Sequence, residues 1–323
     1  MLYPLKFEPI YKERVWGGTR LREHLGRECP DGCPVGESWE LSGLEGDLSV
    51  VSNGFLAGND ISELIEVYMG ELVGDRIYNR FGTEFPILVK LIDAREVLSI
   101  QVHPDDALAA RRHNAYGKNE MWYVLDAEKD ARLWLGFRKR VSEGEYRTHL
   151  EAGTLDELLK VEAPKKGDAY FVPAGTIHSI GKGILLAEIQ QTSDITYRVF
   201  DWNRKDEAGN ARELHTELAV DALDFQGAEG LKITHAGERN RAVELRRCPH
   251  FAVDLVEVDG TVEREYVALD SFVVYLCLEG EIVVECEGGA ESMVGTETVL
   301  LPAEFETARL QGKGKLLEIY MPR

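Results

Sequence analysis

The sequence predicts a mostly β protein built from two β-barrels or sandwiches with a few short helices. The chain has 323 residues, which suggests two domains of roughly 100–200 residues each. Short runs rich in valine, isoleucine, leucine and aromatic residues recur along most of the chain, with turn residues between them. Many short strands at regular spacing are typical of all-β sandwiches and barrels.

The first part of the chain is rich in turn residues, and residues 36–43 alternate as a strand does. A helix is predicted over 59–82, because apolar residues recur there at helical spacing. Asp60 and Glu63 have the spacing of a capping box at its start. Strands are then predicted at 85–94, 98–103, 120–127, 131–137, 168–175, 183–191 and 195–202.

Short helical segments are predicted near 142–150 and 154–160, the second opening with Thr154 at capping-box spacing from Glu157. A further helical segment is a candidate linker, and strands resume after it. We place one domain at 1–235 and a second domain at 236–323. The linker helix is predicted at 211–225, and the later strands at 271–289 (two runs joined by a Glu-Gly turn), 296–306 and 314–322.

Composition excludes several classes of partner. The formal net charge is -20, which argues against binding to nucleic acid or to an anionic membrane surface. A small anionic substrate stays possible, because a local cluster of arginine and lysine can override the global field. No apolar run reaches the roughly 18 residues that cross a bilayer. The first residues lack the pattern of a signal peptide, so we expect a cytoplasmic protein.

Five cysteines, an odd number, make a disulfide framework unlikely to be the basis of the fold. Cys29 and Cys33 are four residues apart with His24 nearby, but a metal site would need more ligands. We therefore interpret them as surface thiols. No exposed apolar helix stands out, and we expect a monomer.

A polar pair stands in the apolar stretch LSIQVHPDD, residues 98–106. Side chains of a strand alternate between two faces, so Gln101 and His103 share a face with Ser99. A buried polar pair must be hydrogen-bonded or must bind something. Both interpretations are open for this stretch taken alone.

A second stretch, GDAYFVPAGTIHSIG at 167–181, carries the sharpest motif. The spacing of Gly167, Pro173, Gly175 and His178 resembles the second metal motif of the cupin barrel, in which a Pro-Gly turn returns a histidine to the interior. The first cupin motif usually holds two histidines two residues apart and a later glutamate. Here Gln101 stands in place of the first histidine, followed by His103 and Glu120.

The four donors would be two imidazoles, one carboxylate and one amide oxygen. This set suits a borderline divalent ion, and we expect one Zn²⁺ per chain. An amide ligand binds weakly and leaves the ion Lewis-acidic. A lone histidine in a strand is more often a hydrogen-bonded core residue, and we interpret the histidines that match no motif as structural or surface residues: His24, His113, His149, His215, His235 and His250.

Taken together, these stretches resemble type I mannose-6-phosphate isomerase (phosphomannose isomerase) in its short bacterial form. The resemblance spans 15–204, and the C-terminal β-region fits too. It is carried by VWGG, GESWELS, FPILVKLIDA, LSIQVHPDD, KNEMWYVL, VPAGTIHSIG and EIQQTSDITYRVFDWNR. The resemblance implies two cupin-type (jelly-roll) β-barrels, and it implies that zinc is bound by Gln101, His103, Glu120 and His178.

The resemblance also implies that Arg198 is an essential active-site residue. Alternation along its strand puts Arg198 on one face with Thr196 and Phe200, where it would face the metal cavity. A sugar phosphate would serve as its anion, although an internal carboxylate is the alternative partner. The residues implied around the substrate are Lys90, Ser99, Lys118, Glu188 and Arg204, the last replacing a lysine of longer relatives.

The function implied is reversible isomerisation of D-mannose 6-phosphate to D-fructose 6-phosphate through a cis-enediol. The base at C2 would be Glu188 or Lys118, and the sequence does not choose between them. The alternatives are an isomerase of another hexose phosphate, a non-catalytic sugar-phosphate-binding bicupin and an iron-dependent cupin dioxygenase. The second barrel is expected to lack a metal, because aligning Pro302 with Pro173 puts Thr307 where His178 stands.

Overall fold

Strands dominate the protein, as predicted. The computed structural model describes residues 1–23, 34–205 and 209–323, and the predicted thiols Cys29 and Cys33 lie outside these ranges. Within the described residues, none of the helices is long and apolar enough to span a membrane. The helices are α1 (Arg20–Glu23), α2 (Ile61–Val73), α3 (Asp75–Phe81), α4 (Asp106–His113), α5 (Glu143–Ala152) and α6 (Thr216–Val220), with 3₁₀ turns η1 (Gly54–Leu56) and η2 (Leu155–Leu158).

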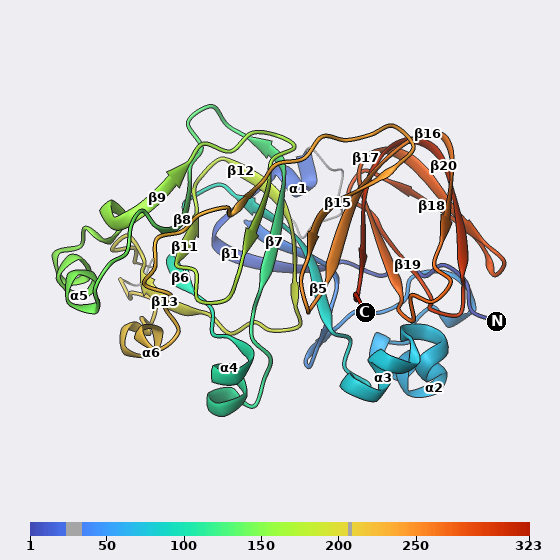
Figure 1. Cartoon of the computed structure of the whole chain (residues 1–323), viewed down its shortest axis with the longest axis horizontal. Helices are drawn as coiled ribbons and strands as arrows, with labels where there is room; N and C mark the ends of the chain where they lie inside the picture. Colours follow the sequence, from blue (N-terminus) through green and yellow to red (C-terminus); the bar gives the residue numbers. More distant parts are fainter. Residues whose placement is uncertain (24–33, 206–208) are drawn as a thin grey trace. The chain divides into compact units, whose positions relative to one another are not determined.

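Two sheets form the first half of the fold (Figure 1). The seven-stranded sheet has the order β1 (Ile10–Gly18), β2 (Val35–Leu41), β5 (Ile87–Ala94), β12 (Ile184–Gln191), β7 (Glu120–Ala127), β10 (Ala169–Val172) and β14 (Lys232–Ile233). The five-stranded sheet has the order β13 (Tyr197–Phe200), β6 (Ile100–Val102), β11 (His178–Ile180), β8 (Leu133–Phe137) and β9 (Leu159–Glu162). A small two-stranded sheet pairs β3 (Gly43–Leu44) with β4 (Asp47–Leu48).

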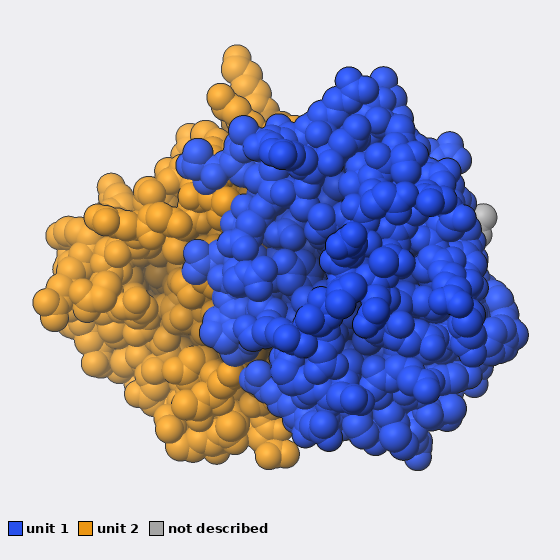
Figure 2. Space-filling model, turned by 45° about the vertical axis from the view of Figure 1, so that its right-hand side comes forward, with its two compact units in different colours: residues 1–10, 39–90, 234–323 blue, residues 11–38, 91–233 orange. Residues whose placement is uncertain are grey.

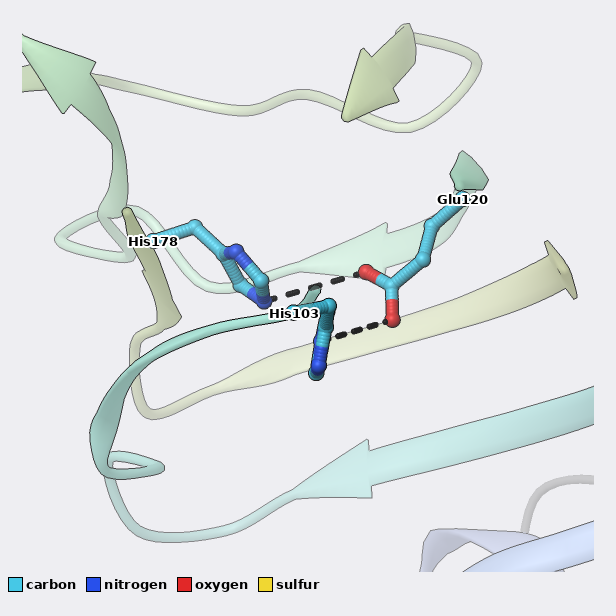
Figure 3. A group of neighbouring side chains, drawn as sticks. All are labelled: His103, Glu120 and His178. Atoms are coloured by element: carbon cyan, nitrogen blue, oxygen red, sulfur yellow. Dashed lines mark ion pairs between the residues drawn. The ribbon is translucent and has the colours of Figure 1, made fainter. Parts of the chain in front are cut away.

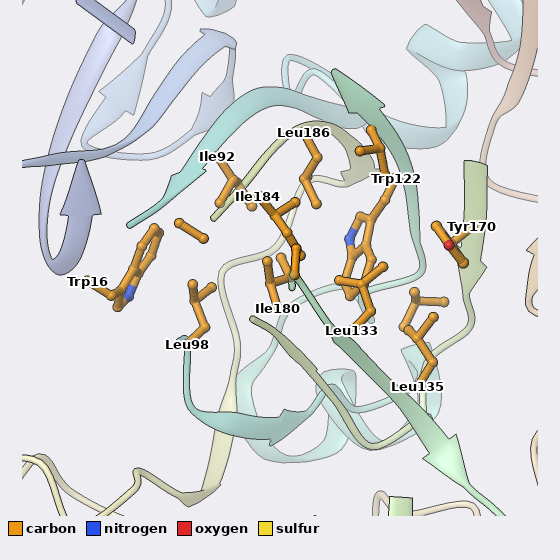
Figure 4. Packing of buried hydrophobic residues seen from close by; sticks show 14 residues of the cluster. Trp16, Ile92, Leu98, Trp122, Leu133, Leu135, Tyr170, Ile180, Ile184 and Leu186 are labelled. Carbon is orange, nitrogen blue, oxygen red and sulfur yellow. The ribbon is translucent and has the colours of Figure 1, made fainter. Parts of the chain in front are cut away.

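A single apolar cluster joins the two large sheets (Figure 4). It takes Trp122, Tyr170 and Leu186 from the seven-stranded sheet, and Leu133 and Ile180 from the five-stranded sheet. Side chains from two facing sheets that meet in one core are the arrangement of a β-sandwich or jelly roll.

The opposite face of the five-stranded sheet has a core of its own. Ile100, Val102 and Val199 pack there with Tyr146 of α5 and Ala219 of α6. Because strand side chains alternate, the residues between them point to the other face, toward the core shared with the seven-stranded sheet. Polar residues at those intervening positions therefore lie inside the sandwich.

The second half of the fold is a six-stranded sheet of long strands. Its order is β15, β16, β20, β17 and β18, and β19 pairs with β17. Its strands are β15 (Ala242–Arg247), β16 (Ala252–Glu265), β17 (Val273–Cys286), β18 (Gly289–Val294), β19 (Thr298–Leu301) and β20 (Thr307–Tyr320).

The compact units do not follow the predicted boundary alone. One unit comprises residues 1–10, 39–90 and 234–323, and the other comprises 11–38 and 91–233 (Figure 2). The last division, between residues 233 and 234, lies beside the predicted boundary at 235, but 1–10 and 39–90 group with the C-terminal part of the chain. A unit assembled from three separate segments leaves no local sign in the sequence.

Three local predictions are wrong and one is confirmed. Residues 271–289 are not a hairpin, because β17 runs on through Gly280, which has a positive φ of 86° and pairs with Gly314 of β20. The register against β20 shifts just before it, between Cys277 and Glu279. Thr154 forms no side-chain cap, and the predicted linker helix shrinks to α6. The capping box of Asp60 and Glu63 at the start of α2 is present.

A buried carboxylate pair lies in the six-stranded sheet. Asp254 and Glu318 are direct cross-strand neighbours, 7% and 0% exposed. Arg264 pairs with Glu318 at 2.9 Å, and the hydroxyl of Tyr320 donates to Asp254 at 3.2 Å. Burial, and then the charge of Glu318, raises the pKa of Asp254 to about 6.

This raised pKa predicts a specific pH dependence of stability. The folded state binds the proton of Asp254 more tightly than the unfolded chain does. The protonated carboxyl therefore contributes to the free energy of unfolding in full below about pH 4, and this contribution is lost as pH rises through about 6. We expect Asp254→Asn to stabilise the protein by about 1–3 kcal/mol at pH 8 and by less at pH 5. Urea unfolding at both pH values measures this, and a difference independent of pH would refute it.

Candidate active site

Three functional side chains form a row across the five-stranded sheet. Arg198 on β13 is the cross-strand partner of Gln101 on β6, and Gln101 is in turn the partner of His178 on β11. Side chains in register on neighbouring strands point to the same face. The apolar neighbours of these residues along each strand pack in the core between the five-stranded sheet and helices α5 and α6. This row therefore points to the other face, into the interior of the sandwich.

The seven-stranded sheet supplies the facing acidic residues. On β7, Glu120 and Trp122 are two residues apart and share a face, and Trp122 lies in the core shared by the two sheets. On β12, Glu188 is the cross-strand partner of Trp122. The strand register thus brings two carboxylates to the interior, where His178 arrives from the other sheet.

His103, Glu120 and His178 converge on one point (Figure 3). Their ligand atoms all lie within 4.8 Å of one another, and each residue is buried. Glu120 Oε1 is 3.1 Å from His103 Nε2, and Glu120 Oε2 is 3.7 Å from His178 Nε2. Two donors bound to a tetrahedral zinc ion lie about 3.3 Å apart, so these separations fit a shared cation.

The hydrogen bonds of the two imidazoles fix which nitrogen faces this point. His103 Nδ1 lies 2.9 Å from the carbonyl of Ile195, and His178 Nδ1 lies 2.9 Å from the carbonyl of Thr176. A carbonyl only accepts, so each neutral ring carries its proton on Nδ1 and presents a lone pair at Nε2. In the described part of the chain, the buried Nε2 of His103 has no hydrogen-bond partner.

The electrostatics keep His103, Glu120 and His178 in the forms that would bind a metal. Burial, and then the charge of Lys118, lowers the pKa of His103 to about 3, and burial also lowers the pKa of His178. Burial alone would raise the pKa of Glu120, but the charge of Lys118 opposes it, and that pKa lies well below its usual range. Neutral imidazoles and an ionised carboxylate are the ligands that a divalent ion requires.

Gln101 lies beside the three ligands. Its Oε1 accepts from Ser99 Oγ at 3.2 Å, and its Nε2 lies 3.3 Å from His178 Nε2. The two ends of an amide are assigned from hydrogen bonding, and half a turn about the last side-chain bond exchanges them. After that turn the oxygen would face the site and Nε2 would donate to Ser99. The position therefore fits a fourth ligand, which stays a prediction.

The other predicted residues are distributed around this centre. Lys118 Nζ is 3.0 Å from Glu120 Oε1, and Glu188 Oε2 accepts from the indole of Trp122 at 2.8 Å. Lys118, Glu188 and Ser99 are all buried. Lys90 is buried with its Nζ 5.9 Å from the centre of the Trp39 ring. Lys90 belongs to the other compact unit, and its contact with substrate stays a prediction.

Three arginines gather at the Arg198 end of the row. Arg198 Nη1 donates to the carbonyl of Glu213 at 2.9 Å, and its Nε is buried without a hydrogen-bond partner in the described residues. Burial, followed by the charge of Arg212, lowers the pKa of Arg198. Asp201 is bound by Arg212 at 2.8 Å and lies 3.9 Å from Arg204. The charges of Glu213 and Glu96 also act on Arg198 and Arg204, respectively. Guanidinium groups gathered in this way are suited to paired contacts with an anion.

Sequence reasoning missed two residues of this site. Trp122 bridges Glu120 and Glu188, and Arg212 binds Asp201. The signal for Trp122 was its place two residues after Glu120 in a buried strand. Arg212 lies in the segment predicted as a linker helix, and nothing in its local pattern marked it.

The described histidines outside the motifs join no metal cluster. Among the described residues, one group of potential ligands lies close enough to share a metal ion: His103, Glu120 and His178. His113 bonds to the hydroxyl of Tyr197, and His149 contacts Thr154. These roles agree with the structural interpretation of the unmatched histidines.

Comparison with known proteins identifies the family. The family model described as "Phosphomannose isomerase type I, catalytic domain" matches residues 4–136, and "Mannose-6-phosphate isomerase, cupin domain" matches residues 243–321. The chain belongs to the type I phosphomannose isomerase family. The predicted family and the cupin character of the C-terminal region are therefore confirmed.

Individual relatives of this phosphomannose isomerase family cover most of the chain. The sequence is 38% identical to mannose-6-phosphate isomerase ManA of Bacillus subtilis, over 86% of each chain. It is 37% identical to mannose-6-phosphate isomerase of Streptococcus mutans, over 89% of each chain. The crystal structure of the mannose 6-phosphate isomerase from Bacillus subtilis matches with a TM-score of 0.88 and 32% identity, covering 98% of this chain and 99% of that one.

Proposed function

We propose that this chain interconverts D-mannose 6-phosphate and D-fructose 6-phosphate by zinc-assisted proton transfer through a cis-enediol. The observation that carries the proposal is the buried convergence of His103, Glu120 and His178, with both imidazole Nε2 lone pairs turned to the carboxylate. The relatives named mannose-6-phosphate isomerase support the substrate.

The metal would be held by His103, Glu120 and His178, with Gln101 as a fourth ligand after its amide turns. Two imidazoles and oxygen donors without thiolates fit zinc in a catalytic site. When bound, a zinc ion supplies Lewis-acid stabilisation of negative charge on the sugar oxygens. The donors come from both sheets, and their burial excludes the water that would weaken this electrostatic effect.

The proton that leaves C2 and returns to C1 needs a base inside the cavity. Glu188 and Lys118 are both buried near the ligands. Lys118 lies 3.0 Å from Glu120, where its ammonium form also balances the ligand charge. Glu188 is separated from Glu120 by the indole of Trp122, which donates to both. Either group would have to hold the proton between C2 and C1 of the enediol.

Arg198, Arg204 and the neighbouring Arg212 would bind the phosphate at the non-reacting end of the sugar. Guanidinium groups bind phosphate oxygens in pairs. Binding energy at that end would hold C1 and C2 at the reacting centre. We assign Ser99 and Lys90 to contacts with the sugar, and we expect the enzyme to act as a cytoplasmic monomer.

Two other functions would use parts of the same site. An isomerase of another hexose phosphate would use the same centre, and a sugar-phosphate-binding bicupin would use the same arginines. A pure binding protein has little need for a set of buried metal ligands, and this favours the enzyme.

A coupled assay of fructose 6-phosphate formation from mannose 6-phosphate tests the proposal. We expect turnover by the zinc-loaded protein, loss of turnover after treatment with a chelator, and recovery when zinc is restored. Glucose 6-phosphate serves as the comparison substrate. Zinc-loaded protein that binds mannose 6-phosphate but never converts it would establish the binding protein instead.

A further inference from the structure

The indole of Trp122 links two buried carboxylates. Its Nε1–H lies 2.8 Å from Glu188 Oε2 and 3.2 Å from Glu120 Oε2. Trp122 is 0% exposed, and both carboxylates are buried. Water therefore does not compete for these contacts, and a hydrogen bond to an ionised acceptor is stronger in such surroundings.

The strand register requires this arrangement. Trp122 and Glu120 share one face of β7, and Glu188 on β12 lies directly opposite Trp122. The rest of the indole packs in the core and meets the ring of His178 edge-on, with ring centres 5.4 Å apart. The Trp122 side chain thus contacts three residues. Its ring meets His178, and its N–H donates to both Glu120 and Glu188.

We infer that Trp122 is a positioning residue, whose N–H orients Glu120 for metal binding and holds Glu188 in place for proton transfer. Lys118 balances the charge of Glu120, and the indole N–H is a donor that both carboxylates share. The part concerning Glu188 rests on the proposed isomerase function. The part concerning Glu120 does not, because it concerns metal affinity alone.

A purely structural role for Trp122 makes a different prediction. A large side chain in the core shared by the two sheets would matter only through its volume, and any comparable cavity in that core would have the same effect. Val124 lies two residues further along the same strand, on the same face and in the same core, and its aliphatic side chain has no hydrogen-bond donor for either carboxylate. Val124→Ala is therefore the matched control for lost packing.

The experiment compares Trp122→Phe, Val124→Ala and the native chain by competition of each apoprotein with a chelator for Zn²⁺. We expect Trp122→Phe to weaken zinc binding at least about 10-fold, as loss of an outer hydrogen bond to a ligand does. Val124→Ala should bind zinc within about 2-fold of the native chain. The inference is overturned if Trp122→Phe binds zinc as tightly as the native chain. It is also overturned if Val124→Ala loses as much zinc affinity as Trp122→Phe.

A second variant removes the N–H without changing the shape. Benzothienylalanine, in which sulfur replaces the indole N–H, is placed at position 122 alone. Because this analogue keeps the shape of tryptophan, it tests the N–H even if Trp122→Phe does not fold. This variant should reproduce the weaker zinc binding. Unchanged zinc binding by this variant overturns the role of the N–H.

Kinetics on zinc-saturated protein test the link to Glu188. We expect Trp122→Phe to lower kcat about 10-fold or more while KM changes by less than about 3-fold, because orientation matters in the transition state. In a Glu188→Gln background the same substitution should lower kcat far less. If the decreases in kcat caused by Trp122→Phe and by Glu188→Gln simply multiply in the double variant, Trp122 does not act through Glu188. Absence of isomerase activity in the native chain would refute the proposed function and leave the zinc measurements decisive for Glu120.

Discussion

Replacing His178 with alanine is expected to remove bound zinc and to lower kcat/KM for mannose 6-phosphate by about three orders of magnitude or more. The substitution takes away one of the two neutral imidazoles whose Nε2 faces Glu120. Loss of a Lewis acid that supplies several kcal/mol of transition-state stabilisation corresponds to a decrease of about 10³ in rate. Metal analysis and steady-state kinetics on the same preparation measure both effects.

His149→Ala is the control for this substitution. His149 belongs to the same compact unit but contacts Thr154 at the end of α5, outside the group of potential metal ligands. Its zinc content and kcat/KM should equal those of the native chain. A His178→Ala protein that keeps one zinc per chain and native turnover would show that the three converging residues are not the metal centre.

Replacing Arg198 with alanine is expected to lower kcat/KM by about two to three orders of magnitude. Arg198 stands in the interior row with Gln101 and His178, and its Nε is buried with no hydrogen-bond partner among the described residues. A charge-assisted contact of a guanidinium with phosphate is worth about 1.5–3 kcal/mol, and lost orientation adds to that. Arg198→Lys should recover little, because an ammonium does not reproduce the paired contact.

The kinetic parameters separate two roles of Arg198. A rise in KM with kcat retained would mean that the guanidinium binds ground state and transition state equally, whereas a fall in kcat would mean that it orients the reacting carbons. Arg147→Ala is the control, because Arg147 forms exposed ion pairs with Glu143 and Glu217. Native kcat/KM in Arg198→Ala would exclude the arginine from the active site.

The group of potential metal ligands could be predicted from sequence because its signals are local. Gln101 lies on β6 and His103 directly follows that strand, and the Pro-Gly turn before β11 returns His178 to the interior. The C-terminal sheet has the same local order, because Pro302 follows β19 and Thr307 begins β20, as Pro173 follows β10 and His178 begins β11.

The features that the sequence did not reveal depend on contacts between distant segments. Trp122 acts on Glu188 because β7 pairs with β12 in one particular register, which no local pattern specifies. Gly280 resembles a turn residue, but pairing of β17 with β20 on both sides of it keeps the strand continuous. Arg212 becomes part of the arginine cluster only when the chain beyond β13 brings it to Asp201.

The central claim is that one zinc ion held by His103, Glu120 and His178 is required for isomerisation of mannose 6-phosphate. The most direct measurement is a titration of the apoprotein with Zn²⁺ in which fructose 6-phosphate formation and bound zinc are followed together. We predict that turnover rises in proportion to bound zinc and saturates at one ion per chain, and that Glu120→Gln shows neither tight binding nor turnover. Full turnover by zinc-free protein, or tight stoichiometric binding in Glu120→Gln, would contradict the account.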